Sequence, residues 1–499
     1  MTEMSYSARF TQLAAERPAH AMVTLVEPSG APVASITWGE MERASNRLAH
    51  KFVAAGVVIG DYVTIALPNS VEFFTACIAA WKVGATPQPV SSRLPSKELD
   101  AIVDLANPKV VCTLDEAAAN AATHTGRVHL GLSELAGSGG DSSPLPDAIA
   151  PSWKAPTSGG STGRPKLIVA SDPSVYDQEP DTDFAAILRI GPWATTVVPG
   201  PMYHNGPFVW AFTQLLKGGH VVLLVRFDAQ ATLAAIERYQ GNALYLVPTM
   251  MSRIWKLPVN VRQRFDMSSL GVVWHLAAPC PAWLKKEWID WLGPDRIWEL
   301  YGGTEGQSAT IISGTEWLAH EGSVGRPVMG EMRIVDEHGD ECPAGTVGEV
   351  FMRPEPGKVT YRYVGAEPTV LTGGWESLGD MGWMDGDGFL YLADRRSDMI
   401  LSGGANIYPA EVESALESHP AVRSCAVIGL PDSDLGQRVH AVVQAVNVSS
   451  EELVAHVAEQ LVRYKVPRSI EFVTEAVRDD AGKVRRSALL AQRRERPQE

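Results

Sequence analysis

The sequence has few cysteines, no long apolar run and no excess of positive charge, and each shortage excludes a class of protein. Its five cysteines include no CxxC pair and no metal-ligand spacing, so we expect buried thiols in a reducing compartment and no disulfide framework. The formal net charge of −15, from 58 acidic and 43 basic residues, argues against a nucleic-acid or anionic-membrane surface.

No uninterrupted apolar stretch reaches the roughly 20 residues that a transmembrane helix requires. The opening MTEMSYSARF lacks the basic and apolar regions of a signal peptide, so the sequence predicts a cytoplasmic protein. With 45% hydrophobic and 20% charged residues the chain is typical of globular proteins, and 499 residues are too many for one hydrophobic core. We therefore expect two or more domains.

Strands and helices alternate in the first part of the chain. DYVTIALPNS (61–70) and PKVVCT (108–113) are predicted strands with a helix between them. Thr37 and Glu40 have the spacing of a capping box, which predicts a helix over 37–60. Further short segments rich in Val and Leu continue the alternation, which is typical of parallel sheets covered by helices.

The pattern changes in the last third of the chain. EMRIVDEHGDECPAGTVGEVFMR has short alternating strands and Asp/Gly turns, which favour antiparallel structure or a small barrel. Beyond it, a helix from Pro409, two strands and a helix near 450–463 predict a compact α+β unit. We place the boundary near 394–398, with a first domain over 1–394 and a second over 395–499.

TSGGSTGRPK (157–166) combines three glycines, four hydroxyl side chains and one lysine. Glycine lets backbone N–H groups approach an anion closely, and the hydroxyls and the Lys166 ammonium add donors, so the segment predicts a phosphate site. It is not a Walker A loop, because Leu167 follows Lys166 where that pattern needs Ser or Thr.

Three later segments carry polar side chains, and each alone has an ordinary structural explanation. YGGTEG (301–306) follows the apolar DRIWEL; its Thr and Glu suit a phosphate and a Mg²⁺, and a plain glycine turn is the alternative. ESLGDMGWMDGDGFLYLADRRSDMI has Asp380 in a predicted Gly-Asp turn and Arg395 in a charge cluster, where a surface ion pair is the alternative. DDAGKVRR has Lys483 in a polar loop, where lysine is usually a solvated charge.

Taken in this order and spacing, these segments resemble the adenylate-forming superfamily of acyl-CoA synthetases, nonribosomal adenylation domains and luciferases. The resemblance extends from SITWGE (35–40) to Lys483. SGGSTGRPK resembles the phosphate loop of the superfamily, YGGTEG its Thr-Glu motif, SLGDMG its ribose-binding Asp and GKVRR its catalytic lysine. DRRSDMILSGGANIYPAEVE resembles the hinge and first helix of its C-terminal domain. Two departures are Leu167, where Gly is common, and Ser397, which with Asp398 beside it replaces the customary Asp or Lys of the hinge.

The resemblance implies an α/β fold. A large N-terminal domain of stacked, mostly parallel sheets with helices and a small barrel-like subdomain would bind acid and ATP. A small, mobile α+β C-terminal domain would carry the catalytic lysine. Two half-reactions are implied: a carboxylate attacks the α-phosphate of ATP to give acyl-AMP and pyrophosphate, and the acyl group then passes to a second nucleophile after the small domain has rotated.

The resemblance also implies roles for individual residues. Lys483 would bridge the α-phosphate and the attacking carboxylate, because both reactants are anionic and charge develops at phosphorus. Glu305 would hold Mg²⁺ and Thr304 would donate to the AMP phosphate. The expected nucleotide-binding residues form three groups: a phosphate cradle, an adenine side and a ribose side. They are Ser158, Gly159, Gly160, Ser161, Thr162, Gly163 and Lys166; Ala277, Ala278, Pro279, Tyr301, Gly302 and Gly303; and Asp380 and Arg395.

The acid pocket is expected in segments that flank the acyl channel of the superfamily. His204, in GPMYHNGPFVW, is a candidate for this pocket and for gating the second nucleophile, with a buried structural histidine as the alternative. Aromatic and Met side chains suggest a bulky, apolar, aromatic or polycyclic acid, because Met adapts to irregular shapes. The expected lining residues are Tyr203, Phe208, Val247, Pro248, Met250 and Met251.

The acceptor stays open. WHLAAPCP…WELYGGTEG and the hinge segment look closest to the bile-acid or steroid type of CoA ligase, which implies ATP, Mg²⁺, a carboxylic acid and CoA. The same segments suit amide bond synthetases of this superfamily, which give the acyl group to an amine. A non-catalytic nucleotide-binding module is a third interpretation, and the joint presence of Lys483, Glu305, Asp380 and Arg395 argues against it. A luciferase-like oxygenase has no support in the sequence.

Overall fold

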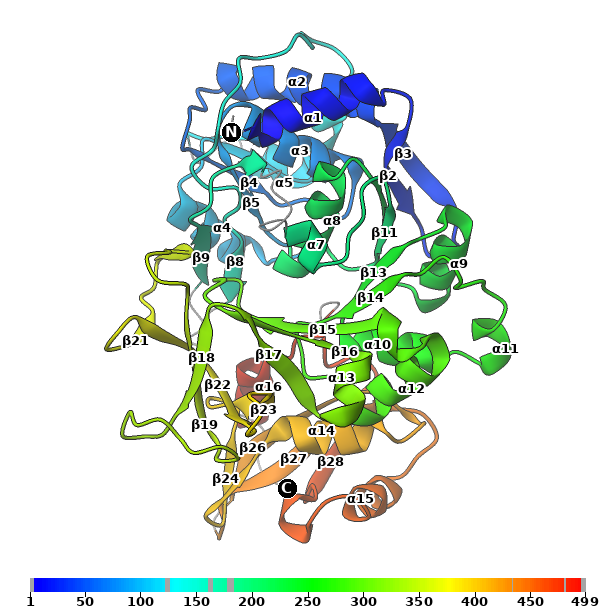
Figure 1. Ribbon diagram of the computed structural model, residues 1–499, viewed down its shortest axis with the longest axis vertical. Coiled ribbons are helices and arrows are strands. Elements are labelled where there is room, and N and C mark those ends of the chain that lie inside the picture. The colour runs from blue at the N-terminus through cyan, green and yellow to red at the C-terminus, as the bar shows by residue number, and fades with distance from the viewer. Residues whose placement is uncertain are drawn as a thin grey trace.

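The computed structural model (Figure 1) describes residues 4–121, 126–159, 165–176, 184–432, 434–479 and 482–494. A central sheet runs through the N-terminal domain, with parallel strands in the order β15-β14-β13-β11-β12-β2 and β3 added antiparallel at the edge. Its inner strands are buried on both faces, which explains their unbroken apolar sequences. The strands are β2 (Ala21–Val26), β3 (Pro32–Thr37), β11 (Thr195–Val198), β12 (His220–Leu224), β13 (Ala243–Leu246), β14 (Val272–His275) and β15 (Ile297–Gly302).

A second, smaller parallel sheet has the order β5-β4-β6-β7. Helix α3 lies between the two sheets, in contact with β4 and β5 on one side and β2 on the other, and is therefore buried along almost its whole length. The strands are β4 (Tyr62–Ile65), β5 (Thr86–Pro89), β6 (Val110–Cys112) and β7 (Val128–Leu130).

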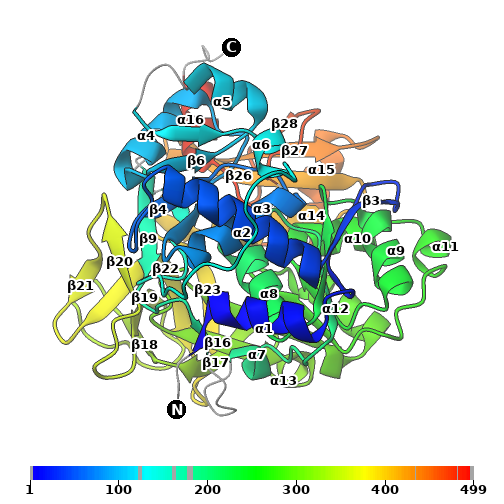
Figure 2. The same ribbon diagram turned by 90° about the horizontal axis from the view of Figure 1, so that it is seen from above.

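Helices surround these sheets, and α2 begins where the sequence predicts it. Helix α2 starts at the predicted capping box: the Thr37 hydroxyl accepts from the Glu40 N–H at 3.3 Å, and the Glu40 carboxylate accepts from the Thr37 N–H at 2.9 Å. It ends at Ala54, six residues before the predicted end. Figure 2 shows α1 and α2 on the near side of the molecule. The helices are α1 (Tyr6–Glu16), α2 (Trp38–Ala54), α3 (Val71–Lys82), α4 (Ser96–Ala106), α5 (Asp115–Ala121), α6 (Leu132–Leu135), α7 (Phe184–Ile187), α8 (Asn205–Leu216), α9 (Ala229–Tyr239), α10 (Pro248–Trp255), α11 (Val259–Arg262), α12 (Ala282–Leu292) and α13 (Gly314–Ala319).

The predicted antiparallel region follows β15. Strands β16 and β17 continue the central sheet, and β17 leads into the antiparallel order β17-β23-β22-β19-β18, the barrel-like subdomain, with β21 on β22. A short sheet β20-β9-β8 joins the phosphate-loop strands to this region, and β1 pairs with β10. The strands are β1 (Met4–Ser5), β8 (Thr157–Gly159), β9 (Pro165–Ala170), β10 (Val175–Tyr176), β16 (Ala309–Ser313), β17 (Ser323–Met329), β18 (Glu331–Val335), β19 (Gly348–Arg353), β20 (Tyr361–Val364), β21 (Thr369–Leu371), β22 (Trp375–Met384) and β23 (Leu390–Arg395).

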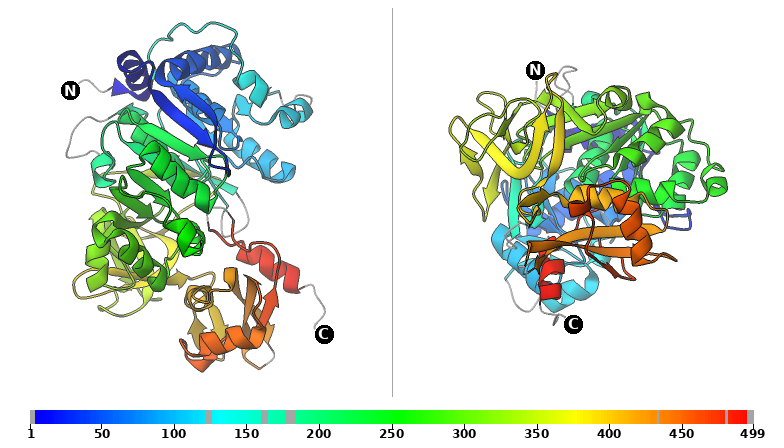
Figure 3. Two further views of the ribbon diagram at one scale, coloured as in Figure 1. Left: turned by 90° about the vertical axis from the view of Figure 1, so that its right-hand side faces the viewer. Right: turned by 90° about the horizontal axis from the view of Figure 1, so that it is seen from below.

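The small C-terminal domain follows β23 and has its own core (Figure 3). Its sheet has the order β25-β24-β27-β26, with β28 parallel to β27, and its first helix begins at Pro409 as predicted. The elements are β24 (Ile400–Ser402), β25 (Ala405–Ile407), α14 (Pro409–Glu417), β26 (Val422–Asp432), β27 (Gly436–Ala445), α15 (Ser450–Ala458), β28 (Ser469–Phe472) and α16 (Arg486–Arg494).

The cysteines differ in burial, and Cys280 and Cys342 are only partly buried, contrary to the expectation of buried thiols. All five cysteines are free, and Cys77, Cys112 and Cys425 are buried, so burial raises the pKa of each of these three thiols. No helix that the structure describes is both long and apolar enough to cross a membrane.

Candidate active site

Several groups of predicted site residues follow four neighbouring parallel strands of the central sheet. Strands β11, β13, β14 and β15 run in one direction and end on the same side. Ligands of α/β proteins bind where such carboxyl ends meet. The segments that follow these strands contain Tyr203 and His204, Val247 and Pro248, Ala277 to Pro279, and Thr304 and Glu305.

The loop after β14 contains backbone strain. Ala277 has a φ of 75°, a left-handed conformation that residues other than glycine rarely adopt and that is common at functional sites. Its neighbours in the predicted adenine segment, Ala278 and Pro279, are half-buried and exposed, respectively. Their contact with adenine stays a prediction.

Glu305 is the centre of a compact polar cluster. Its side chain is nearly buried, and its Oε1 accepts a hydrogen bond of 2.5 Å from the Tyr363 hydroxyl and lies 3.6 Å from the Lys166 ammonium. The same ammonium lies 3.7 Å from the centroid of the Tyr363 ring, a cation–π contact. Burial lowers the pKa of Lys166, and Glu305 opposes that change. A carboxylate, an ammonium and a phenol thus meet beside the predicted phosphate loop.

Strand pairing explains this cluster. β9 carries Lys166 and pairs on one side with β8, where Ser158 is opposite Lys166, and on the other with β20, where Val364 is opposite Leu167. Tyr361 and Tyr363 share one face of β20, because side chains alternate along a strand. Ser158 and Gly159 end β8, whereas the predicted phosphate-binding residues Gly160, Ser161, Thr162 and Gly163 lie outside the described residues.

The glycines before Glu305 allow the chain to pass close to its neighbours. A Cβ on Gly303 would lie 2.5 Å from Leu378 Cδ1 and 2.8 Å from Glu305 Oε2, so a larger residue would displace the carboxylate. The predicted turn begins later than expected, because β15 extends through Tyr301 to Gly302. Only residues 303–306 of the motif are therefore loop.

The cluster suits a magnesium ion that substrate phosphates help to hold. Among the described residues, no group of three or more His, Cys, Asp or Glu side chains could hold a metal ion alone. Mg²⁺ is usually bound by one or two carboxylates together with phosphate oxygens and water, so a single buried carboxylate beside a phosphate loop matches its chemistry.

Asp380 forms a second polar centre, and its predicted backbone conformation is wrong. Asp380 lies inside strand β22 and not in a turn, because it pairs in register with Arg395 of β23. Its Oδ1 accepts from the Arg395 Nε at 3.2 Å, and its Oδ2 accepts from the Tyr301 hydroxyl at 2.9 Å. Burial and Asp380 together raise the pKa of Tyr301 well above its usual value, so the phenol stays protonated and donates. Three predicted nucleotide-binding residues thus form one hydrogen-bonded group.

Lys483 reaches this region from the C-terminal domain. Desolvation by the surrounding protein and the charge of Arg395 lower its pKa, and Asp479 and Glu305 oppose them. Gly482, the residue before Lys483, lies against Thr249 at the start of α10, so the Lys483 loop meets the N-terminal domain just after β13. Asp479 holds the loop, because its Oδ1 accepts from the Lys483 N–H at 2.8 Å and its own N–H donates to the Lys483 carbonyl at 2.9 Å.

The predicted hinge residues follow β23 directly. The Asp398 N–H donates to the Arg395 carbonyl at 3.0 Å, and the Ser397 hydroxyl donates to Asp398 Oδ1 at 3.3 Å. Asp398 also forms an ion pair of 2.8 Å with Arg486, the first residue of α16. Which of the two residues acts as the hinge stays a prediction.

The predicted acid-pocket residues differ in exposure. Tyr203 and His204 are partly exposed, with ring centroids 4.3 Å apart at the start of α8. Phe208 is 1% exposed and packs among aromatic side chains of the core. Val247, Pro248, Met250 and Met251 are also buried, at the start of α10. Their role in acid binding stays a prediction.

Two polar residues of this region escaped the sequence analysis. Tyr363 contacts Glu305 because β20, which carries Tyr363, pairs with β9. The alternating tyrosines of YRY were the only local sign that this segment contributes to the site. Lys154, four residues before Ser158, is 7% exposed; its ammonium donates to Asn205 Oδ1 and lies 4.6 Å from the Trp153 ring centroid. A lone lysine among apolar residues would have been the signal for it.

Burial of Lys154 predicts a pH-dependent stability. Burial lowers the pKa of Lys154 from 10.5 to about 7, against the opposing charges of Asp172 and Glu305. The unfolded chain therefore binds one more proton than the folded chain between pH 7 and 10.5, so wild-type stability rises across that range. Lys154→Met should stabilise the protein at pH 6.5 by roughly 3 kcal/mol, with the gain disappearing toward pH 10. Urea unfolding at both pH values measures this, and a destabilised variant at pH 6.5 would contradict it.

Comparison with known proteins agrees with this geometry. The family model described as AMP-binding enzyme matches residues 10–360, and that of the AMP-binding enzyme C-terminal domain matches 411–483. The chain belongs to the AMP-binding enzyme family. It is accordingly an adenylate-forming enzyme that activates a carboxylate, within the superfamily that the motifs indicated.

Similar proteins span nearly the whole chain. A feruloyl-CoA synthase of Amycolatopsis sp is 33% identical over 464 residues, covering 90% of this chain and 92% of the relative. Among solved structures, o-succinylbenzoate CoA synthetase (MenE) of Bacillus subtilis with its acyl-adenylate intermediate has a TM-score of 0.81 at 26% identity, with 98% of each chain covered. The amide bond synthetase McbA of Marinactinospora thermotolerans has a TM-score of 0.77 at 27% identity, covering 98% of this chain and 99% of McbA.

Proposed function

We propose that this AMP-binding enzyme adenylates a bulky aromatic or polycyclic carboxylic acid and transfers the acyl group from acyl-AMP to the thiol of CoA. One observation carries the proposal: Gly482, next to Lys483, lies against Thr249, which follows β13 at the same edge of the central sheet as the segment that holds Glu305. In that arrangement Lys483 provides a positive charge at the reacting atoms, and the other site residues bind ATP and the acid.

In the adenylation step, a carboxylate oxygen of the acid attacks the α-phosphorus of ATP, and the bond from that phosphorus to pyrophosphate breaks. The Lys483 ammonium contacts both anions, which lowers their repulsion and stabilises the charge that develops at phosphorus. Lys166 and the hydroxyls of its loop hold the departing phosphates. Mg²⁺, held by Glu305 and phosphate oxygens, neutralises phosphate charge when bound.

Asp380 binds the ribose in this proposal, because a carboxylate can accept from two hydroxyls and is oriented by Arg395 and Tyr301. Asp380→Asn should therefore raise the KM for ATP about 10-fold, since a hydrogen bond to a charged group contributes about 1.5–3 kcal/mol. The KM for the acid should change far less. Initial-rate pyrophosphate release against ATP and against acid measures both, and equal changes in the two KM values would contradict the ribose role.

In the transfer step, the C-terminal domain (395–499) rotates about Ser397 or Asp398 and removes Lys483, so that the second nucleophile can reach the acyl carbonyl. The sulfur of the CoA thiol attacks the acyl carbon, the bond from that carbon to the AMP oxygen breaks, and AMP leaves. Rotation is needed because the ammonium occupies the side from which the nucleophile must approach.

The class of acid rests on the relatives and on the predicted pocket. The feruloyl-CoA synthase and the o-succinylbenzoate CoA synthetase are named for aromatic acids, and Tyr203, His204 and Met250 are the aromatic and adaptable side chains that such acids need. In this proposal His204, at the start of α8, contacts the ring of the acid and gates the acceptor.

An amine is the alternative acceptor, and the structural likeness to the amide bond synthetase McbA favours it. CoA is the preferred acceptor because the feruloyl-CoA synthase, which is 33% identical to this chain, is named for a CoA product.

A pyrophosphate-release screen tests the proposal directly. Purified enzyme is given ATP, Mg²⁺ and one acid at a time from aliphatic, aromatic and steroidal panels, and hits are repeated with CoA and with small amines. We expect acid-dependent release with aromatic or steroidal acids, and an acyl-CoA identified by mass. An amide as the only product would show that the acceptor is an amine rather than CoA. ATP binding without acid-dependent pyrophosphate release would contradict the proposed enzymatic function.

A further inference from the structure

Helix α10 of the N-terminal domain contacts the C-terminal domain at both of its ends. At its start, Thr249 lies against buried Gly482, where a Cβ on the glycine would be 3.0 Å from the Thr249 Oγ1. Just past its other end, Lys256 donates to two backbone carbonyls of the C-terminal domain. Because Gly482 precedes Lys483, the first contact is adjacent to the catalytic lysine.

Lys256 binds the carboxyl end of helix α14. Its Nζ lies 3.1 Å from the carbonyl oxygen of Glu417, the last residue of α14, and 2.5 Å from that of Val422, the first residue of β26. The final carbonyls of a helix lack intrahelical partners and carry partial negative charge, so an ammonium satisfies them well. Lys256 is half-buried, which shields the contact from water.

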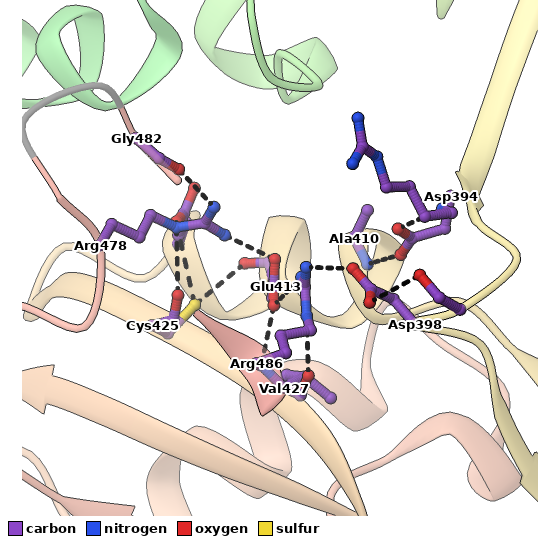
Figure 4. A network of polar contacts seen from close by, with 12 residues as sticks. Asp394, Asp398, Ala410, Glu413, Cys425, Val427, Arg478, Gly482 and Arg486 are labelled. Atoms are coloured by element: carbon purple, nitrogen blue, oxygen red, sulfur yellow. Dashed lines mark hydrogen bonds and ion pairs between the residues drawn. The ribbon is translucent and has the colours of Figure 1, made fainter. Parts of the chain in front are cut away.

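Side chains continue this contact to the catalytic loop (Figure 4). The Glu417 carboxylate lies 3.4 Å from the Nε of Arg478, and the Nη1 of Arg478 donates to the Gly482 carbonyl at 3.1 Å. A chain of contacts therefore runs from Lys256 through Glu417 and Arg478 to the residue before Lys483. Figure 4 shows Arg478 and Gly482 side by side above α14.

The surrounding ion pairs hold this chain rigid within the C-terminal domain. Glu413 is 3% exposed and pairs with Arg478 at 2.5 Å and with Arg486 at 2.6 Å. Burial raises the pKa of Glu413, but the two guanidinium groups lower it more, so the carboxylate stays ionised. Arg486 also pairs with Asp398 at the predicted hinge. The loop of Lys483, the end of α14 and Asp398 thus move as one unit.

We propose that Lys256 is a positioning residue that latches the C-terminal domain in the orientation for adenylation, by holding the end of α14 while Thr249 supports the Lys483 loop. The proposal rests on the proposed function, because it concerns the first of the two half-reactions. Rotation for transfer breaks the contacts of Lys256 with Glu417 and Val422. The helix that carries the latch also carries Met250 and Met251 of the predicted acid pocket.

The test is Lys256→Met, which keeps the length of the side chain and removes its donors. The half-reactions are measured separately, as acid-dependent pyrophosphate exchange and as transfer from synthetic acyl-adenylate. We expect adenylation to slow about 10-fold, from the loss of hydrogen bonds to a charged donor, with the KM values for acid and ATP within about twofold. Transfer should stay unchanged or become faster. Lys256→Arg should restore adenylation.

Lys286→Met, at an exposed position on neighbouring helix α12, is the matched control and should behave as wild type. Equal losses in both half-reactions, or unchanged adenylation, would overturn the latch.

Limited trypsin cleavage after Arg395 or Arg396 gives a second measurement that needs no activity. Arg395 and Arg396 are already exposed, and a released C-terminal domain leaves the hinge backbone less restrained, so Lys256→Met should be cleaved several-fold faster than wild type or Lys286→Met. Equal cleavage rates would overturn the latch. If wild-type enzyme instead failed to adenylate any acid, the proposed function would fail while the cleavage rates still decided the latch.

Discussion

Lys483→Ala should reduce acid-dependent pyrophosphate exchange by about 100- to 1,000-fold, because one positioned donor to a developing charge commonly contributes that much. Transfer from synthetic acyl-adenylate should be nearly unaffected, since the lysine has left the site by then. The physical reason is the position of the Lys483 loop: Gly482 lies against Thr249, at the edge of the sheet where the Glu305 segment also begins, so we expect the ammonium beside the reacting atoms. Single-turnover assays of the two half-reactions measure the split.

Lys465→Ala is a suitable control for this change, because Lys465 lies in the same domain and pairs with Glu411. It should leave both half-reactions close to wild type. A Lys483→Ala enzyme that adenylates at the wild-type rate, or loses both half-reactions equally, would contradict the assigned role.

Glu305→Gln should reduce adenylation by about 100-fold or more, because a magnesium ligand contributes several kcal/mol of charge stabilisation. The change keeps the shape of the side chain but removes the negative charge that Lys166 and Tyr363 surround. The Mg²⁺ concentration at half-maximal rate should rise at the same time. Pyrophosphate release titrated with Mg²⁺ measures both effects.

Tyr363→Phe separates the metal role from the packing of the cluster. It removes the 2.5 Å hydrogen bond to Glu305 and leaves the ring over Lys166. We expect a loss of less than about 10-fold with an unchanged Mg²⁺ requirement. If Glu305→Gln kept the wild-type Mg²⁺ dependence, Glu305 would have no contact with the metal.

Local signals predicted the elements that local interactions stabilise. The capping box at Thr37 and Glu40 and the helix start at Pro409 depend on neighbours in sequence, so the residue pattern was sufficient for both. The order of the strands was beyond local patterns, because the β9–β20 pairing joins segments nearly 200 residues apart. Tyr363 was missed for that reason.

Asp380 shows the same limit in another form. Gly379 before it has a positive φ, which is typical of turns, yet pairing with Arg395 keeps Asp380 in strand β22. The sequence indicated its role by resemblance but could not supply its partners Tyr301 and Arg395, which come from two other strands. Lys256 was missed because its acceptors are backbone carbonyls, which every residue has and which no sequence pattern can therefore indicate.

A disulfide across the domain interface tests whether the C-terminal domain must carry Lys483 out of the site before acyl transfer. A Cβ on Gly482 would lie 3.8 Å from the Cβ of Thr249, close to the usual separation of about 3.8 Å in disulfides. In the T249C/G482C double variant, oxidised with diamide, we expect acyl-adenylate formation in a single turnover without transfer, and recovery of transfer on reduction. Gly482 has a φ of 77°, which strains a cysteine there, so bridge formation is first confirmed by mass. A bridged enzyme that transfers the acyl group as fast as the reduced one would contradict this expectation.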